Sequence, residues 1–107
     1  MFMIEDSLLE ALAYDLLTNA ATGVSEDCVG LLSMAHERED NLATREVIGA
    51  MIKNAELARS RQASVCQSPG YVAVYLSLGR DFCLTENATA CFRKMIKKVT
   101  DQGLIRP

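Results

Sequence analysis

The secondary structure of this chain is expected to change at Ser68-Pro69-Gly70-Tyr71-Val72-Ala73-Val74-Tyr75-Leu76-Ser77-Leu78-Gly79. A proline disfavours helix in the residue before it, and a Pro-Gly pair suits the central positions of a type II turn. After that turn, valine and leucine alternate with tyrosine, alanine and serine, which is typical of a strand. We therefore predict a strand over residues 71–79. A lone strand leaves its backbone groups unpaired, so we expect its partner in another chain or in a segment missing here; residues 81–84 give a weaker signal for a second strand in a short hairpin.

Four amphipathic helical patterns cover most of the remaining sequence. They run over about residues 5–19, from Ser25 to the charged run 37–40, over residues 43–60, and from Thr85 to Gly103. The fold class is therefore expected to be mainly α with a minor β element (α+β), as a single domain over residues 1–107.

Helix ends are also readable from the sequence. Ser25, Asn41 and Thr85 are the expected N-caps, because their side-chain oxygens can accept a hydrogen bond from the first helical turn. Gly103 suits the C′ position of the last helix and would place Leu104 against Val99 in a Schellman arrangement.

The composition of the chain narrows its function class. Half of the 107 residues are hydrophobic and the net charge is −3, which indicates a globular domain and speaks against a general nucleic-acid binder. The N-terminus has no basic region of a secretory signal, and no apolar run reaches the roughly 18 residues of a membrane span. We therefore expect a cytoplasmic protein without nucleic-acid or membrane partners, in which the cysteines stay thiols or bind metal.

Two other groups of residues could bind a metal, but neither has a favourable pattern. His36 lies beside Glu37 and Glu39, but a single histidine at a helix end is more often a surface residue. The four cysteines, Cys28, Cys66, Cys83 and Cys91, are 38, 17 and 8 positions apart, which fits no ordinary zinc pattern. Cys66 differs from the others because a loop before the Pro-Gly turn can present it to a ligand.

Four motifs around this cysteine occur in a fixed order. They are Asn54-Ala55-Glu56-Leu57-Ala58-Arg59, Val65-Cys66-Gln67, the stretch from Gly70 to Gly79, and Gly103-Leu104-Ile105-Arg106-Pro107. In order and spacing they resemble the N-terminal part of the iron–sulfur hydro-lyases, the class I fumarases and the α subunits of L(+)-tartrate dehydratases. The resemblance covers residues 42–107 well and the first two helices loosely. In that family the cysteine motif is Cys-Gln-Asp-Thr-Gly and the closing motif is Gly-Tyr-Leu-Arg-Pro.

The resemblance implies a lyase that adds water to a small dicarboxylic acid, or removes it, as in fumarate/malate or tartrate/oxaloacetate. It also implies a 4Fe-4S cluster held by three cysteines, whose free iron acts as a Lewis acid on the substrate. Cys66 matches the first cluster cysteine and is the expected metal ligand. Gln67 and Ser68 match positions that border the substrate.

Two departures from the family pattern bear on activity. Ser68 replaces an aspartate, so an acid–base role at this position is lost, and Pro69 replaces a threonine and removes a backbone donor. The other two cluster cysteines of the family lie beyond the position matching Pro107. We therefore expect a hydro-lyase part that is inactive by itself, with the cluster absent from the isolated chain. A homo-oligomer or a complementary subunit would complete it; the alternative is a non-catalytic, self-associating or partner-binding helical module.

Overall fold

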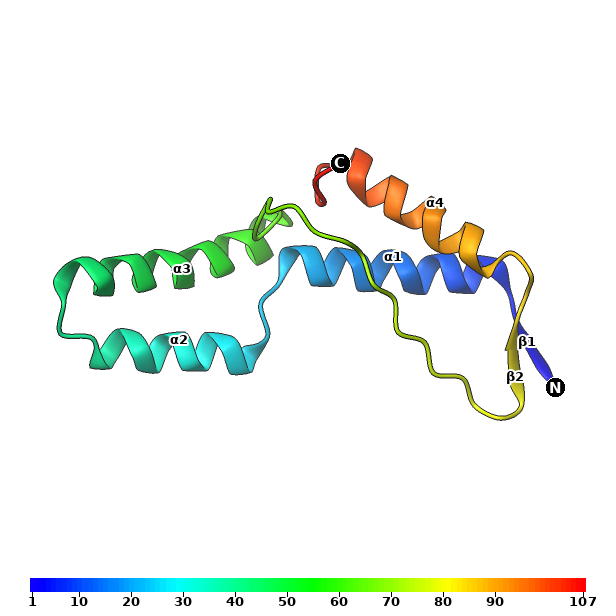
Figure 1. Cartoon of the computed structure of the whole chain (residues 1–107), viewed down its shortest axis with the longest axis horizontal. Coiled ribbons are helices and arrows are strands. Elements are labelled where there is room, and N and C mark those ends of the chain that lie inside the picture. The colour runs from blue at the N-terminus through cyan, green and yellow to red at the C-terminus, as the bar shows by residue number, and fades with distance from the viewer. The chain divides into compact units, whose positions relative to one another are not determined.

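The computed structural model describes residues 1–107, and its elements are mainly helical (Figure 1). In chain order they are β1 (Phe2–Ile4), α1 (Asp6–Thr22), α2 (Glu26–Arg38), α3 (Leu42–Arg61), β2 (Phe82–Leu84) and α4 (Ala88–Asp101). The predicted fold class, mainly α with a minor β element, is confirmed. None of the helices combines the length and the apolar character needed to span a bilayer. The chain divides into two compact units, residues 1–19 with 67–107 and residues 20–66.

Two of the three predicted N-caps are confirmed. The Ser25 hydroxyl accepts a hydrogen bond from the Cys28 amide at 3.3 Å, and the Asn41 side chain accepts one from the Thr44 amide at 3.0 Å. Both caps satisfy an amide of the first turn that has no partner within the helix.

The predicted cap of the last helix is wrong. α4 begins after Asn87, whose side chain makes no capping hydrogen bond. The Thr85 hydroxyl instead accepts a hydrogen bond from the Asn87 amide at 3.2 Å, so Thr85 orders the turn that precedes the helix. A side chain two residues before an amide can stabilise a turn as readily as a helix start, and the sequence does not distinguish the two.

The end of α4 has the predicted Schellman arrangement. Gly103 adopts a φ of 78°, its amide donates to the Thr100 carbonyl at 2.9 Å, and the Leu104 amide donates to the Val99 carbonyl at 3.0 Å. These bonds satisfy two of the carbonyls that the last turn leaves open.

In the first unit, α1 and α4 are joined by polar contacts beside a small apolar core. Lys94 bonds to both carboxylate oxygens of Glu10 at 3.1 and 3.2 Å, and the Tyr14 hydroxyl donates to the Gln102 side chain at 3.0 Å. The buried apolar side chains of this unit are Leu9, Ala13, Cys91, Met95 and Val99. They recur every four residues along each helix, which places them on one helical face.

The sheet of the first unit differs from the prediction. β1 and β2 form a parallel pair, with Phe2 opposite Phe82, Met3 opposite Cys83 and Ile4 opposite Leu84. The weaker signal at residues 81–84 therefore marks a real strand, but its partner is the start of the chain and the pair is not a hairpin.

The strand predicted over residues 71–79 is absent. This stretch carries no assigned strand, and no backbone–backbone hydrogen bond involves residues 71–78 (Figure 1). Alternating β-branched and aromatic residues favour extended backbone, but a strand also needs a pairing partner, and the chain supplies none here.

The second unit is built on two neighbouring helices, α2 and α3, linked through residues 39–41. A Cβ atom added at Gly49 would lie 3.3 Å from His36 Nε2. Because glycine has no side chain, the His36 imidazole can lie close to the backbone of α3 at this point. The histidine considered as a metal ligand is thus half-buried in a helix contact. Ala55 and Ala58 of α3 are buried in the same unit.

Candidate functional site

The backbone that leads to Cys66 is fixed within the second unit. The Val65 amide donates to the Ala21 carbonyl at 2.9 Å, and the Val65 carbonyl accepts from the Asn54 side-chain amide at 2.9 Å. The Ser64 hydroxyl donates to the Cys66 carbonyl at 2.7 Å. Both backbone polar groups of the residue before Cys66 are therefore occupied, which restricts the position from which the cysteine side chain leaves the chain.

The thiol of Cys66 is exposed, as its expected position in a loop predicted. The type II turn predicted at Pro69-Gly70 is absent, because these residues form no turn and Gly70 lacks the positive φ that such a turn requires. An exposed thiol on a fixed backbone can reach an external ligand or a metal without unfolding its surroundings. The sequence points to Cys66 but gives no signal for Asn54, because the hydrogen bond from the Asn54 side chain spans 11 positions.

Gln67 begins the part of the first unit that follows Cys66 in sequence. Its side-chain amide donates to the Gly103 carbonyl at 3.0 Å, which uses one of the two N–H groups on Nε2. The Ser68 side chain, next in sequence, is exposed. Gln67 therefore ties its own segment to the end of α4, and Ser68 follows with an exposed hydroxyl.

The four thiols do not gather. Cys28 is exposed on α2, Cys83 is half-buried on β2, and Cys91 is buried on α4, where burial raises the pKa of its thiol. No group of three histidine, cysteine, aspartate or glutamate side chains is placed to hold a metal ion. A 4Fe-4S cluster with three thiolate ligands therefore does not fit the residues of this chain alone, whereas the exposed Cys66 suits the role of one ligand.

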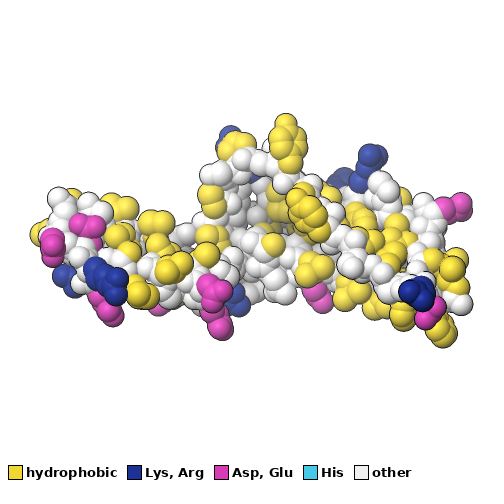
Figure 2. Space-filling model, turned by 60° about the horizontal axis from the view of Figure 1, so that its bottom comes forward, with side chains coloured by type: hydrophobic (Ala, Val, Ile, Leu, Met, Phe, Trp, Pro, Cys, Tyr) yellow, Lys and Arg dark blue, Asp and Glu magenta, His cyan; other side chains and the backbone are white.

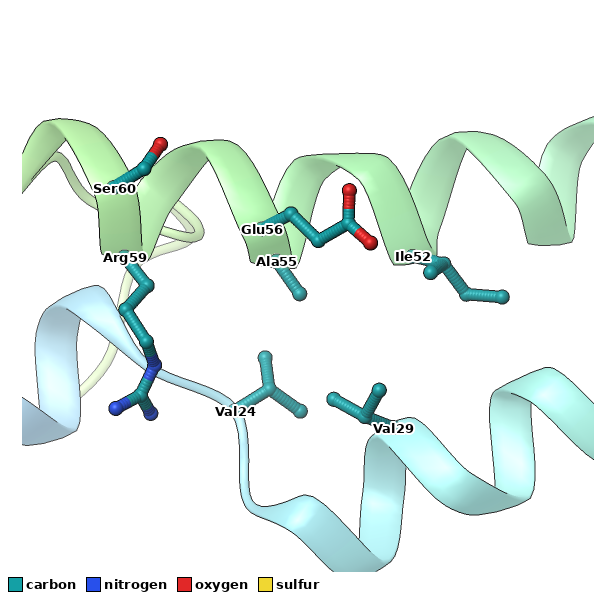
Figure 3. A pocket seen from close by; sticks show the side chains of 7 residues that line it. All are labelled: Val24, Val29, Ile52, Ala55, Glu56, Arg59 and Ser60. Atoms are coloured by element: carbon teal, nitrogen blue, oxygen red, sulfur yellow. The ribbon is translucent and has the colours of Figure 1, made fainter.

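A groove of about 360 Å³ lies within the second unit (Figure 3). Val24 and Val29 stand on one side of it, opposite Ala55 and Ile52 of α3, with Glu56, Arg59 and Ser60 completing the lining. Cys66 does not line this groove. Its largely apolar walls suit a hydrophobic side chain rather than a dicarboxylate, so we do not place the substrate there.

A polar cluster in the first unit was not predicted from the sequence. The Asp6 carboxylate accepts hydrogen bonds from the Thr85 hydroxyl and, at 2.9 Å, from the Asn87 side-chain amide. These bonds favour the ionised form, first through Thr85 and then through Asn87, and lower the pKa of Asp6 below its ordinary value. The cluster ties the start of α1 to the turn before α4, and we assign it a structural role.

Comparison with known proteins places these features in a family context. A family model described as fumarate hydratase (Fumerase) matches residues 10–107. The curated protein "Putative L(+)-tartrate dehydratase subunit alpha" of Methanocaldococcus jannaschii is 26% identical over 95 residues, which cover 87% of this chain and 33% of the relative. The chain thus spans about one third of the length of the curated relative it matches. No solved structure matches the chain significantly.

Proposed function

The chain belongs to the fumarate hydratase (Fumerase) family, and we propose that it forms part of an iron–sulfur hydro-lyase for a small dicarboxylic acid. Fumarate/malate and tartrate/oxaloacetate are the proposed substrate pairs, in keeping with the names of the family and of the archaeal relative. Because the chain spans one third of that relative, we propose that further polypeptide, in the same subunit or in a complementary one, completes the active site. Four free thiols support a reducing compartment, the cytoplasm.

The observation that carries this proposal is the exposed thiol of Cys66 on a backbone held by Ala21 and Asn54. Thiolates are the ligands that iron–sulfur clusters require, and a ligand already fixed in position loses little freedom when the cluster forms. Cys66 is proposed as one ligand. The other ligands come from outside the described chain, so no catalytic step is assigned to these residues alone.

Gln67 and Ser68 are the proposed substrate contacts. The second N–H of the Gln67 amide and the Ser68 hydroxyl can each donate a hydrogen bond to a carboxylate or hydroxyl oxygen. A serine hydroxyl does not titrate near neutral pH, so Ser68 would orient the substrate rather than exchange its proton.

Anaerobic reconstitution tests the proposal. The chain would be mixed with the part of the Methanocaldococcus jannaschii subunit that lies outside the match, together with iron and sulfide, and the brown charge-transfer absorbance would be measured. We expect Cys66→Ser to lose most of the absorbance, because a thiolate ligand is removed. The matched control is Cys28→Ser, which changes an exposed thiol on α2 and should leave the absorbance unchanged.

The possible outcomes test two claims separately: that Cys66 is a cluster ligand, and that the chain is part of a hydro-lyase. Equal colour in wild type and Cys66→Ser would remove Cys66 as a ligand. A mixture that stays colourless in every combination would count against the hydro-lyase assignment itself.

The second candidate function is a non-catalytic module that binds a partner. It is favoured by Ser68 and Pro69, which stand where the family has an acid and a backbone donor, and by apolar side chains left exposed in the first unit. A stable but colourless complex with the same added polypeptide would support this module instead of the enzyme.

A further inference from the structure

Residues 71–78 form an exposed apolar segment of the first unit. Tyr71 and Tyr75 are 103% and 94% exposed, and the side chains on the alternate positions, Val72, Val74, Leu76 and Leu78, are also exposed. Figure 2 shows large hydrophobic side chains standing on the outside of the molecule. Because folded proteins rarely leave a continuous run of this kind in water, both faces of the segment are suited to burial by another surface.

The backbone of the same segment is ready to pair. No backbone–backbone hydrogen bond involves residues 71–78, and the segment contains no proline that would remove a donor. Its period-two alternation and high β-propensity fit a strand. Addition of a neighbouring strand would satisfy these groups without any rearrangement of the helices.

A second apolar surface of the first unit also lacks a cover. Leu8, Leu12 and Leu16 recur every four residues along α1 and are exposed, whereas Leu9 and Ala13 on the adjoining face are buried. α1 therefore presents apolar side chains on two faces, and only one of them is used within the chain. A helix that is apolar on two faces is typical of an element enclosed by a larger core.

The length of the relative and the exposure of both faces of the segment indicate what covers it. The curated relative is about three times as long as the stretch it shares with this chain, so the family contains polypeptide enough to cover these surfaces. A second copy pairing through a two-fold axis would use one edge of the segment and would leave its other edge open. Burial of both faces and both edges instead requires strands and a covering layer from different polypeptide.

We propose that residues 71–78 form an inner β-strand when the chain associates with the remaining part of a tartrate dehydratase-type subunit. The added polypeptide supplies a neighbouring strand on each edge of the segment and a layer over the exposed face of α1. This inference rests on the proposed function, since it takes the partner from the family, and it assigns the surface through which the parts assemble.

Hydrogen exchange tests the strand directly. The chain alone and the chain mixed with the unmatched part of the Methanocaldococcus jannaschii subunit would be compared by mass spectrometry, and light scattering would report the mass of the complex. Without the added polypeptide we expect the amides of residues 71–78 to exchange at the rate of an open chain. In the complex, their exchange should slow by about tenfold or more.

Two matched variants identify the contact. Val74→Lys places a charge in the exposed segment, and Val47→Lys makes the same change at an exposed position of α3. Circular dichroism of the chain alone should be the same for both variants, because neither valine is buried. Val74→Lys should weaken assembly by about tenfold or more, and Val47→Lys should leave it within about twofold of wild type.

The outcomes separate this inference from the proposed function. A complex that binds iron through Cys66 while residues 71–78 still exchange fast would overturn the strand and leave the hydro-lyase proposal standing. Absence of any complex would overturn both. A dimer of the chain alone that protects residues 71–78, and that Val74→Lys abolishes, would show that the occupant is a second copy and would also overturn the inference.

Discussion

At the scale of single residues, Asn54 is the side chain that most directly supports Cys66. Its side-chain amide, on α3, donates a hydrogen bond to the Val65 carbonyl at 2.9 Å. The role of this asparagine is therefore to position the backbone and not to touch a ligand.

Asn54→Ala tests this positioning role. Loss of one hydrogen bond should lower the free energy of unfolding by about 1 kcal/mol relative to Asn19→Ala, a matched change in α1 that gains the same helix propensity. Urea unfolding followed by circular dichroism measures the difference, and hydrogen exchange of residues 63–66 should be faster in Asn54→Ala. Identical exchange in the two variants would contradict the assigned role.

Asp6 gives a prediction on pH. Its pKa in the folded chain is lower than the ordinary value of 3.8, because Thr85 and Asn87 bond to the ionised form. The unfolded chain therefore binds a proton more readily than the folded chain as the pH falls through this range. The stability that Asp6 contributes is present above the ordinary carboxyl pKa and is lost below it.

Asp6→Asn should therefore make stability less dependent on pH in the acid range. Urea unfolding of wild type and variant at neutral pH and at pH values below 3.8 measures this. The gap between the two proteins should narrow as the pH falls. A constant gap would show that the Asp6 bonds do not depend on its charge.

At the scale of secondary-structure elements, the end of α4 depends on one glycine. Gly103 has a φ of 78°, a conformation in which a Cβ atom is strained, whereas Gly30 lies within α2 with open space around its Cα. Gly103→Ala should cost about 1–2 kcal/mol of stability. Gly30→Ala should instead add about 0.5–1 kcal/mol, because alanine favours helix.

Thermal or urea unfolding of the two glycine variants checks the opposite signs. An increase in stability for Gly103→Ala would contradict the Schellman arrangement. Since the Gly103 carbonyl accepts the bond from Gln67, the same variant also tests whether the helix end supports the candidate site.

A structural feature is predictable from this sequence when the residues that form it are close together along the chain. Ser25, Asn41 and Gly103 form their capping bonds with residues three positions away, so the sequence predicts these helix ends. The prediction of a strand at residues 71–79 was wrong, because a strand needs a partner and the local sequence does not show whether one is present. β2 gave only a weak signal, since its partner β1 lies at the opposite end of the sequence.

The same distinction applies to the candidate site. The exposure of Cys66 was predictable because Pro69 and Gly70, three and four positions later, disfavour helix and place the cysteine in a loop. The bonds of Val65 to Ala21 and Asn54 were not, because they join residues 44 and 11 positions apart. The roles of Cys66, Gln67 and Ser68 as ligand and substrate contacts stay predictions until the reconstitution is done.

At the scale of the whole molecule, the longest stretch without helix or strand runs from Gln62 to Asp81. It carries Tyr71 and Tyr75, both almost fully exposed, whereas Tyr14 lies in α1 and donates a hydrogen bond to Gln102. Exposed segments of this kind are the preferred sites of proteolytic cleavage.

Brief digestion with chymotrypsin should therefore cut first after Tyr71 and Tyr75, with Tyr14 intact at the same time. Mass spectrometry of the early fragments identifies the sites. First cleavage at Tyr14 would contradict the described exposure. If the added polypeptide covers residues 71–78 as proposed, both early cuts should disappear in the complex.

The parallel pairing of β1 with β2 also constrains how the chain is made. Phe2 and Phe82 are partners, so about 80 residues must be synthesised after the first strand before the second exists, which takes roughly 4–16 s at ordinary rates of translation. Until then, the backbone of β1 is unpaired and the Phe2 ring lacks its contact with Phe82, whose ring centroid lies 5.7 Å away in the folded chain. If translation stalls before Leu84 is added, residues 2–4 stay unpaired. Molecular chaperones that recognise hydrophobic peptides are then expected to bind this segment.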